Sequence, residues 1–250
     1  MNADTILSAL GLPDSASVNQ RVPKKLLLEN GAPTAADKRR INEGIEEIQW
    51  LASLKPNTIG VPDYCDDTRE YLEIALLLVT LRGEAKAARL SGLIHRAIPY
   101  PLFLVLLQGD QAILSLAHKR RAQNEAGKFV LDGDIAEVTV TGNASENSQF
   151  LVALALGNQP RANLLQLYQG WIDTLVALQA SQITGSFSKS ATHEAAIARR
   201  EAVLKCVELE TKIATLRNTA AKEKQIARRV ELNLEIKGLE GELIETKGKL

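Results

Sequence analysis

A histidine and two cations at the end of a predicted strand are the residues of this sequence with the clearest chemical potential. His118, Lys119 and Arg120 directly follow the apolar segment Gln111–Ala117. Such a cluster can bind a phosphate group or position an acidic partner through charge-assisted hydrogen bonds. It also fits a strand that runs out into solvent with a charged edge, which discourages unwanted strand pairing. The residue types agree with either interpretation.

A second set of cations lies near the start of the chain. Arg21, Lys24 and Lys25 are close in sequence to Lys38–Arg40, and together they predict a basic patch on the first helices. Such a patch would contact the phosphates of a nucleic acid. The alternative is a solvated helix face, and the formal net charge of zero argues against a chain that coats nucleic acid by itself.

A third pattern concerns acids of the kind that a metal-dependent nuclease needs. A nuclease of the PD-(D/E)xK type places an acid on one strand and an acid-x-lysine on the next, to hold Mg²⁺ and activate water. Pro62 and Asp63 supply the first pair, but Glu84-Ala-Lys86 lies at the start of a predicted helix. A divergent nuclease would draw its acids from Asp63, Asp66, Asp67 and Glu73, and its cation from Lys86 or Lys119.

The remaining motifs of catalysis are missing. The sequence has no GxxxxGK[ST] loop, GxGxxG turn, HExxH helix or GxSxG elbow. Its two cysteines, Cys65 and Cys206, are far apart and form no zinc-binding pattern. We therefore expect no cofactor, no metal and no catalytic residue. The apolar runs are too short for membrane helices, and the first residues lack the basic segment of a signal peptide, so we expect a cytoplasmic protein.

The elements that must position these residues follow a strand, helix, strand, strand, strand order. Apolar runs and turn residues predict strands at Tyr71–Leu81, Leu102–Leu107, Gln111–Ala117 and Ile135–Thr141, with a helix over Glu84–Ala97. This order is typical of a mixed β-sheet with helices on its faces, so the expected fold class is α/β (α+β).

The flanking segments are shorter. Helices are predicted at residues 3–10 and, with Thr34 and Asp37 as a capping pair, at Ala35–Glu43. Ile45–Leu54 fits a strand or a helix, and Thr58–Val61 a short strand. Phe150–Leu156 fits either type, Ala162–Leu178 fits a helix, and Gln182–Ser190 fits a linker. The expected organisation is therefore an α/β domain over residues 1–145, a helical connector over 146–185 and an arm over 186–250.

The arm carries two apolar series with coiled-coil spacing. Cys206, Leu209, Ile213, Leu216 and Ala220 step by three and four residues, as do Leu232, Ile236, Leu239 and Leu243. The polar interval between them allows one long discontinuous helix or a helical hairpin. The hairpin is slightly favoured because it buries both series within the chain. The residues predicted to bind a partner subunit, or a second copy of the chain, are Leu209, Ile213, Leu216, Leu232, Ile236, Leu239 and Leu243.

Several stretches resemble a prokaryotic group, the domain of unknown function 4391 family. They are Val22–Lys25, Ile48–Trp50, Leu54–Pro56, Ile98–Pro101, Ser115–Arg120, Lys222–Gln225 and Val230–Asn233. The resemblance spans most of the chain and defines no chemistry. It implies a setting, because such proteins look like companions of helicases and DNA methyltransferases in restriction-modification or phage-defence islands.

Three hypotheses follow. The first is a non-catalytic accessory or scaffolding subunit of a DNA-targeting anti-phage defence complex, which docks to a helicase or methyltransferase through the arm. The second is the divergent metal-dependent nuclease. The third is a nucleic-acid-binding module with a basic patch.

Overall fold

The computed structural model describes residues 2–123, 125, 127–143 and 147–250. Its contacts divide the chain into two compact units, Met1–Leu175 and Val176–Leu250. The boundary between these units lies within a long helix, α7 (Leu164–Thr184).

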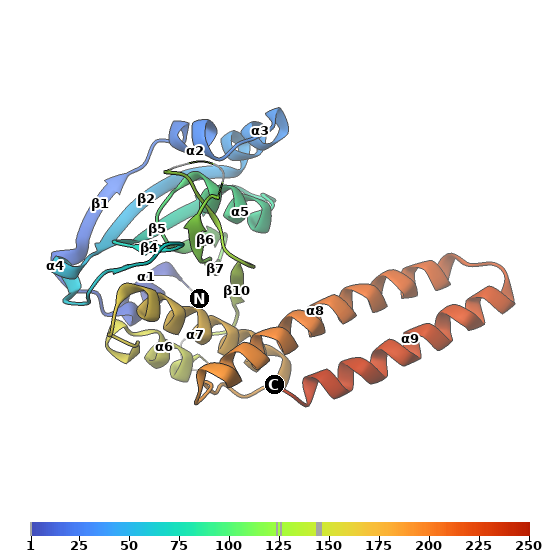
Figure 1. Ribbon diagram of the computed structural model, residues 1–250. Coiled ribbons are helices and arrows are strands. Elements are labelled where there is room, and N and C mark those ends of the chain that lie inside the picture. Colours follow the sequence, from blue (N-terminus) through green and yellow to red (C-terminus); the bar gives the residue numbers. More distant parts are fainter. Residues whose placement is uncertain (1, 124, 126, 144–146) are drawn as a thin grey trace. The chain divides into compact units, whose positions relative to one another are not determined.

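The first unit is built on a six-stranded sheet with the strand order β1-β2-β5-β6-β7-β10 (Figure 1). Only β5 and β6 are parallel among these neighbours, so the sheet is mixed, as predicted. The strands are β1 (Ser17–Arg21), β2 (Ile45–Leu54), β5 (Ile74–Leu81), β6 (Leu102–Gln108), β7 (Gln111–Leu116) and β10 (Ala136–Val140).

The two central strands are apolar on both faces because helices cover the sheet on both sides. In β6, Leu102, Leu104 and Leu106 point into one core, whereas Phe103 lies on the opposite face. A parallel pair requires a crossover connection, and α5 (Ala87–Ala97) provides it between β5 and β6. Because helices bury both faces of β5 and β6, nearly every residue of these two parallel strands is apolar.

Three helices share the larger core with one face of the sheet. They are α2 (Lys25–Asn30), α3 (Ala35–Gly44) and α5, and they contribute Leu27, Ile41 and Leu93 to the core. The chain approaches α5 very closely at Gly31, where a Cβ atom would lie 2.5 Å from the Ala97 Cβ.

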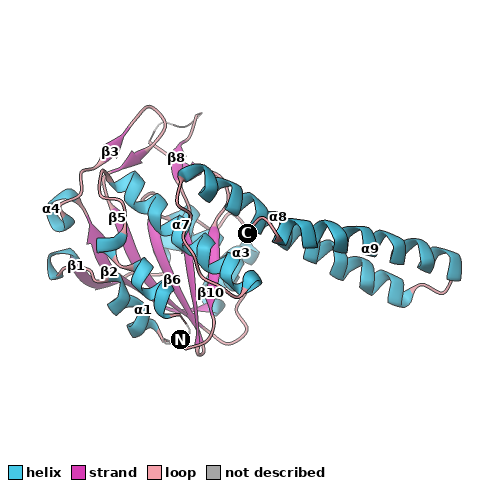
Figure 2. Cartoon of the chain, turned by 90° about the horizontal axis from the view of Figure 1, so that it is seen from below, coloured by secondary structure: helices cyan, strands magenta, loops and turns pink. Residues whose placement is uncertain are grey.

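The opposite face is covered by α1 (Ala3–Leu10), α6 (Ser148–Leu154) and the first part of α7, which Figure 1 labels and Figure 2 shows from below. The Trp171 ring packs edge-on against Phe103, with centroids 5.1 Å apart, and its indole N–H donates to the Leu154 carbonyl at 2.9 Å. Residues predicted to form a separate connector thus complete the core of the first unit.

The remaining elements are small. They are the helix α4 (Pro56–Ile59), the 3₁₀ turns at Asp14–Ala16 and Leu156–Asn158, and two two-stranded sheets, β3 (Tyr64–Cys65) with β4 (Glu70–Tyr71) and β8 (Lys119–Arg121) with β9 (Phe129–Leu131). The strand predicted at Thr58–Val61 was wrong. Pro56 begins a helical turn there, and the Thr58 hydroxyl accepts the Lys55 backbone N–H at 2.8 Å.

The second unit contains the end of α7 and two long helices, α8 (His193–Lys222) and α9 (Ile226–Lys247). These two helices pack against each other as a hairpin, which confirms the favoured alternative for the arm. None of the described helices has both the length and the apolar character that crossing a membrane requires.

Candidate functional site

His118 belongs to a chain of hydrogen bonds. Its Nδ1 lies 2.5 Å from the Tyr71 hydroxyl, and its Nε2 lies 2.8 Å from Oε1 of Gln169. The Gln169 amide donates to Asp173 at 2.8 Å. Because Oε1 of Gln169 can only accept, His118 carries its proton on Nε2 and accepts the Tyr71 hydroxyl at Nδ1. The side chain is 8% exposed, so this imidazole joins β4 to α7 inside the first unit.

Lys119 is also buried, with 2% of its surface exposed. Its ammonium donates to the carbonyl oxygen of His95 at 2.6 Å and to that of Ile98. These carbonyls lie at the C-terminal end of α5, where a cation complements the helix dipole. Burial lowers the pKa of Lys119 to about 7. Lys119 is therefore neither a solvated strand edge nor a surface phosphate ligand.

A buried polar group that sequence reasoning missed adjoins Lys119. His95 Nε2 lies 3.0 Å from the Ser115 hydroxyl, which lies 2.7 Å from that of Ser91. Burial, with the nearby Lys119 charge, lowers the pKa of His95 to about 3, so the imidazole is neutral. Its Nδ1 has no hydrogen-bond partner among the described residues. The available signal was a histidine within the otherwise apolar face of α5.

Arg120 and its neighbours are used in ion pairs that join the two small sheets. Arg69 donates to Asp132 through Nε at 2.8 Å and Nη2 at 2.6 Å. Arg120 lies 3.9 Å from the same carboxylate. Arg121 pairs with Glu70 at 2.5 Å. The predicted cluster of His118, Lys119 and Arg120 therefore acts within the fold, where hydrogen bonds and carboxylates engage each member.

Five of the six cations of the predicted basic patch have an ion-pair or hydrogen-bond partner within the fold. Arg21 pairs with Glu47 and Lys25 with Glu29, each at 3.5 Å. The Lys24 ammonium donates to the backbone carbonyls of Asn42 and Ile45, at the end of α3, and its burial lowers its pKa. The helix α3 itself pairs Arg39 with Glu43 and Arg40 with Asp37.

Two of the four acids considered for a nuclease, Asp66 and Glu73, are engaged in contacts within the fold. Asp66 closes a turn, because its carboxylate accepts the Tyr64 hydroxyl at 2.7 Å and the Arg69 backbone N–H at 2.6 Å. Glu73 accepts the Ser53 hydroxyl at 2.6 Å and pairs with Lys55 at 3.1 Å. Within the described part of the chain, no three Asp, Glu, His or Cys side chains come together as a metal site.

The predicted partner-binding residues of the arm lie inside the hairpin. Leu209, Ile213, Leu232 and Ile236 are buried. Leu216, Leu239 and Leu243 pack against the cluster formed by Ile213, Ala220, Leu232 and Ile236. The ion pairs Lys205–Glu242, Arg217–Glu240 and Lys247–Glu210, at 3.1, 2.6 and 2.9 Å, also join the two helices. We call this contact the inner seam, and it leaves none of its larger side chains free for a partner.

A different set of aliphatic side chains on the hairpin is exposed. On α8 these are Ile197, Leu204 and Val207. On α9 four aliphatic residues, Ile226, Val230, Leu234 and Ile244, have exposed fractions of 71%, 52%, 66% and 73%. We call these four residues the outer row. They lie on a different side of α9 from the inner seam, because helical spacing separates the two sets.

Two glycines interrupt α9 beside the outer row. Gly238 and Gly241 lie between Leu234 and Ile244, and a Cβ atom at either position would meet no heavy atom within 4 Å. Glycine within a helix costs about 0.5–1 kcal/mol relative to alanine. Packing inside the chain therefore does not require these glycines, and they leave two positions of α9 between Leu234 and Ile244 without a side chain.

Comparison with known proteins assigns the chain to a family. No curated protein and no solved structure is detectably similar to this chain. The model of the family described as domain of unknown function (DUF4391) matches residues 10–243, which include the sheet, α7 and nearly all of the hairpin. The chain therefore belongs to the DUF4391 family.

Proposed function

We propose that this chain is a cytoplasmic, non-catalytic docking subunit of a prokaryotic DNA-targeting anti-phage defence complex. It joins a helicase or DNA methyltransferase subunit through the outer row of α9. One observation carries the proposal: four aliphatic side chains of α9 are more than half exposed although the inner seam of the hairpin is complete.

Exposed aliphatic side chains gain free energy when a partner covers them. The gain is about 25 cal/mol for each Å² of apolar surface removed from water. Contiguous exposed apolar patches on folded proteins are typical of interaction sites. Ile226, Val230 and Leu234 recur every four residues, so they form one continuous surface along the first half of α9 rather than scattered contacts.

The occupant that fits this surface is an amphipathic α-helix of the partner subunit. A helix packs its apolar row against another such row, as α8 already does on the inner seam. Opposite Gly238 and Gly241 the partner has room for a bulky side chain. Glutamates directly follow Val230, Leu234 and Ile244 in the sequence, so lysine or arginine on the flank of the partner helix improves the match.

The defence setting is what the family resemblance implies, by association rather than by mechanism. The described residues also favour a binding role over catalysis. His118, Lys119, Asp66 and Glu73 are each held by hydrogen bonds or ion pairs within the fold. The side chains of the outer row, in contrast, are exposed, and no other part of the hairpin covers them.

Co-purification from the native host tests this proposal. The tagged full-length chain is compared with the double variant Leu234→Ser/Ile244→Ser, and bound proteins are identified by mass spectrometry. Val152→Ser is the matched control, because Val152 is a 65% exposed aliphatic residue on α6. We expect the helicase or methyltransferase to accompany the wild type and the control but not the double variant. Equal recovery with all three proteins would exclude the outer row as the docking surface.

A further inference from the structure

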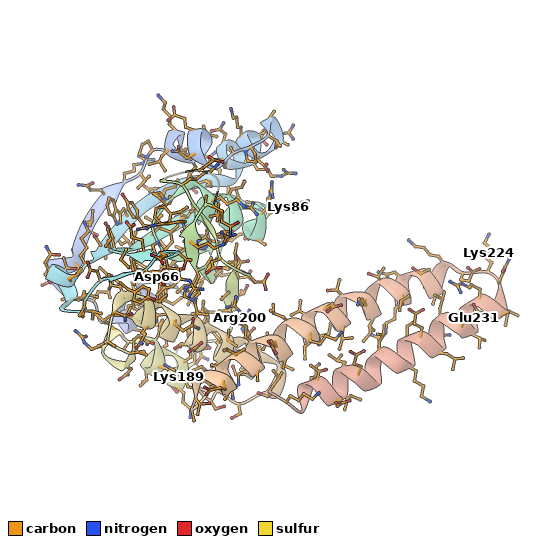
Figure 3. The ribbon with its side chains drawn as sticks, viewed as in Figure 1. Asp66, Lys86, Lys189, Arg200, Lys224 and Glu231 are labelled. Atoms are coloured by element: carbon orange, nitrogen blue, oxygen red, sulfur yellow. The ribbon has the colours of Figure 1, made fainter. Side chains whose placement is uncertain are left out.

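The turn between α8 and α9 carries an excess of positive charge. Residues 222–231, which we call the arm tip, have a formal charge of +2 in a chain whose total is zero. Figure 3 labels Lys224 and Glu231 at this end of the hairpin. The exposed cations of the arm tip are Lys222, Lys224, Arg228 and Arg229.

The two carboxylates of the arm tip are already engaged. Glu231 pairs with Arg228 at 2.7 Å. Glu223 accepts the backbone N–H of Gln225 at 2.8 Å. Lys222, Lys224 and Arg229 have no carboxylate partner within the part of the chain that the structure describes. This distinguishes the arm tip from the predicted patch at Arg21 and Lys25, where each cation has an acidic neighbour.

The start of α9 also departs from the usual preferences of a helix. Acidic residues stabilise the first turn of a helix and cations oppose the helix dipole there, by about 0.3–1 kcal/mol each. The first turn of α9 contains no acid, and Arg228 and Arg229 follow its first two residues. The side chain of Gln225, the N-cap residue of α9, makes no capping hydrogen bond. Arg228 is compensated by its ion pair with Glu231, but Arg229 has no carboxylate partner among the described residues. An uncompensated cation at this position is expected where a surface meets another molecule.

We propose that the arm tip binds the phosphate backbone of double-stranded DNA. A duplex carries one charge for about every 1.7 Å of its axis, so three unpaired cations within eight residues meet neighbouring phosphates. The arm tip contains no aromatic residue, so it lacks the stacking platform typical of single-strand binding. Contacts with phosphates carry no sequence information, so the arm tip contributes affinity and orientation rather than specificity.

This inference does not depend on the outer row. The docking variant Leu234→Ser/Ile244→Ser changes no charge, so its DNA binding equals that of the wild type even where it has lost its protein partner. The arm tip variant keeps every residue of the outer row. Failure of one proposal therefore leaves the other measurable.

Fluorescence anisotropy with a short labelled duplex, over a series of KCl concentrations, tests the arm tip. The full-length wild type is compared with Lys222→Gln/Lys224→Gln/Arg229→Gln. The control variant Lys25→Gln/Lys38→Gln/Arg39→Gln removes the same charge from α2 and α3. Melting curves confirm that all three proteins are folded.

We expect the arm tip variant to bind more weakly, with a slope of log K against log[salt] that is smaller by about 3, whereas the control keeps the slope of the wild type. Three results would overturn the proposal. They are no binding of the duplex by the wild type at low salt, equal slopes for the wild type and the arm tip variant, and binding to anionic lipid vesicles without binding to the duplex.

Discussion

The ammonium group of Lys119 lies inside the first unit and donates a 2.6 Å hydrogen bond to the backbone carbonyl of His95. A strand residue thereby caps the C-terminal end of α5, the helix that crosses between the two parallel strands. Lys24 does the same for α3, through the carbonyls of Asn42 and Ile45. Two lysines that the sequence presents as members of basic clusters therefore hold helix ends.

Lys119 predicts how stability changes in mild alkali. Its pKa is about 7 in the folded protein, below its usual value of 10.5, so between these values the unfolded chain binds more protons. The free energy of unfolding should therefore rise with pH across this window, by at most about 1.4 kcal/mol per pH unit. Urea unfolding at several pH values should show this rise in the wild type and lose it in Lys119→Met. Parallel profiles would contradict the assignment.

Asp37 predicts the behaviour in acid. This buried carboxylate accepts hydrogen bonds from Arg89, Arg40 and Thr34, and the bonds from Arg89 hold its pKa down at about 2. Its contribution to stability is present above the unfolded value of 3.8 and is lost as pH falls toward 2.

Asp37→Asn should therefore melt below the wild type at neutral pH, with a difference that shrinks near pH 2. Thermal melts followed by circular dichroism measure both effects. Glu43→Gln, in an exposed pair on the same helix, is the control and should change little. A deficit of Asp37→Asn that persists undiminished at the acid end would contradict the account.

The Tyr71–His118 contact predicts a moderate loss of stability. Tyr71→Phe keeps the ring that packs against Tyr168 but removes the hydroxyl that His118 Nδ1 accepts. A buried acceptor without its partner destabilises a protein by about 1–3 kcal/mol. Urea unfolding should show a loss in this range. Tyr100→Phe, at a tyrosine that is 47% exposed, should leave stability unchanged, and equal effects of the two substitutions would exclude a structural role for the His118 bond.

We expect that a substitution in the inner seam destabilises the hairpin without destabilising the first unit. Leu232→Ala removes a buried side chain from the α8–α9 contact, and such changes cost about 2–5 kcal/mol. Hydrogen exchange should accelerate in α8 and α9 while β5 and β6 keep their protection, since these strands belong to the other unit. Leu234→Ala, on the outer row, is the control and should leave exchange in the hairpin near that of the wild type. Faster exchange throughout the chain would show that the two units unfold together.

Much of the fold follows from hydrophobic pattern and turn chemistry. The sequence correctly predicts the buried strand at Ile74–Leu81, the helix start capped by Thr34 and Asp37, and the β6–β7 hairpin. The pattern of Ile45–Leu54 fitted both the helical and the strand periodicity. The segment forms a strand because it pairs with β1 on one edge and with β5 on the other. The strand β1, SVNQR, lacks an apolar alternation because it is an exposed edge, so the sequence pattern could not reveal it.

The candidate sites depended on facts that local sequence does not contain. Whether Lys119 reaches solvent depends on where α5 ends in space, and whether Arg21 is free depends on Glu47 in the neighbouring strand. The arm illustrates the same limit. Its coiled-coil spacing identified the residues of the inner seam. The exposure of the outer row depends on which faces of α8 and α9 pack against each other, and the sequence alone does not show this.

Protection of the outer row by the partner tests the central claim most directly. Leu234→Cys in a Cys65→Ser background is labelled with a maleimide in the presence and absence of the purified helicase or methyltransferase, and Val152→Cys serves as the control. The account predicts that the partner slows labelling at residue 234 but not at residue 152. Equal labelling rates at residue 234, under conditions where the two proteins associate, would contradict docking through the outer row.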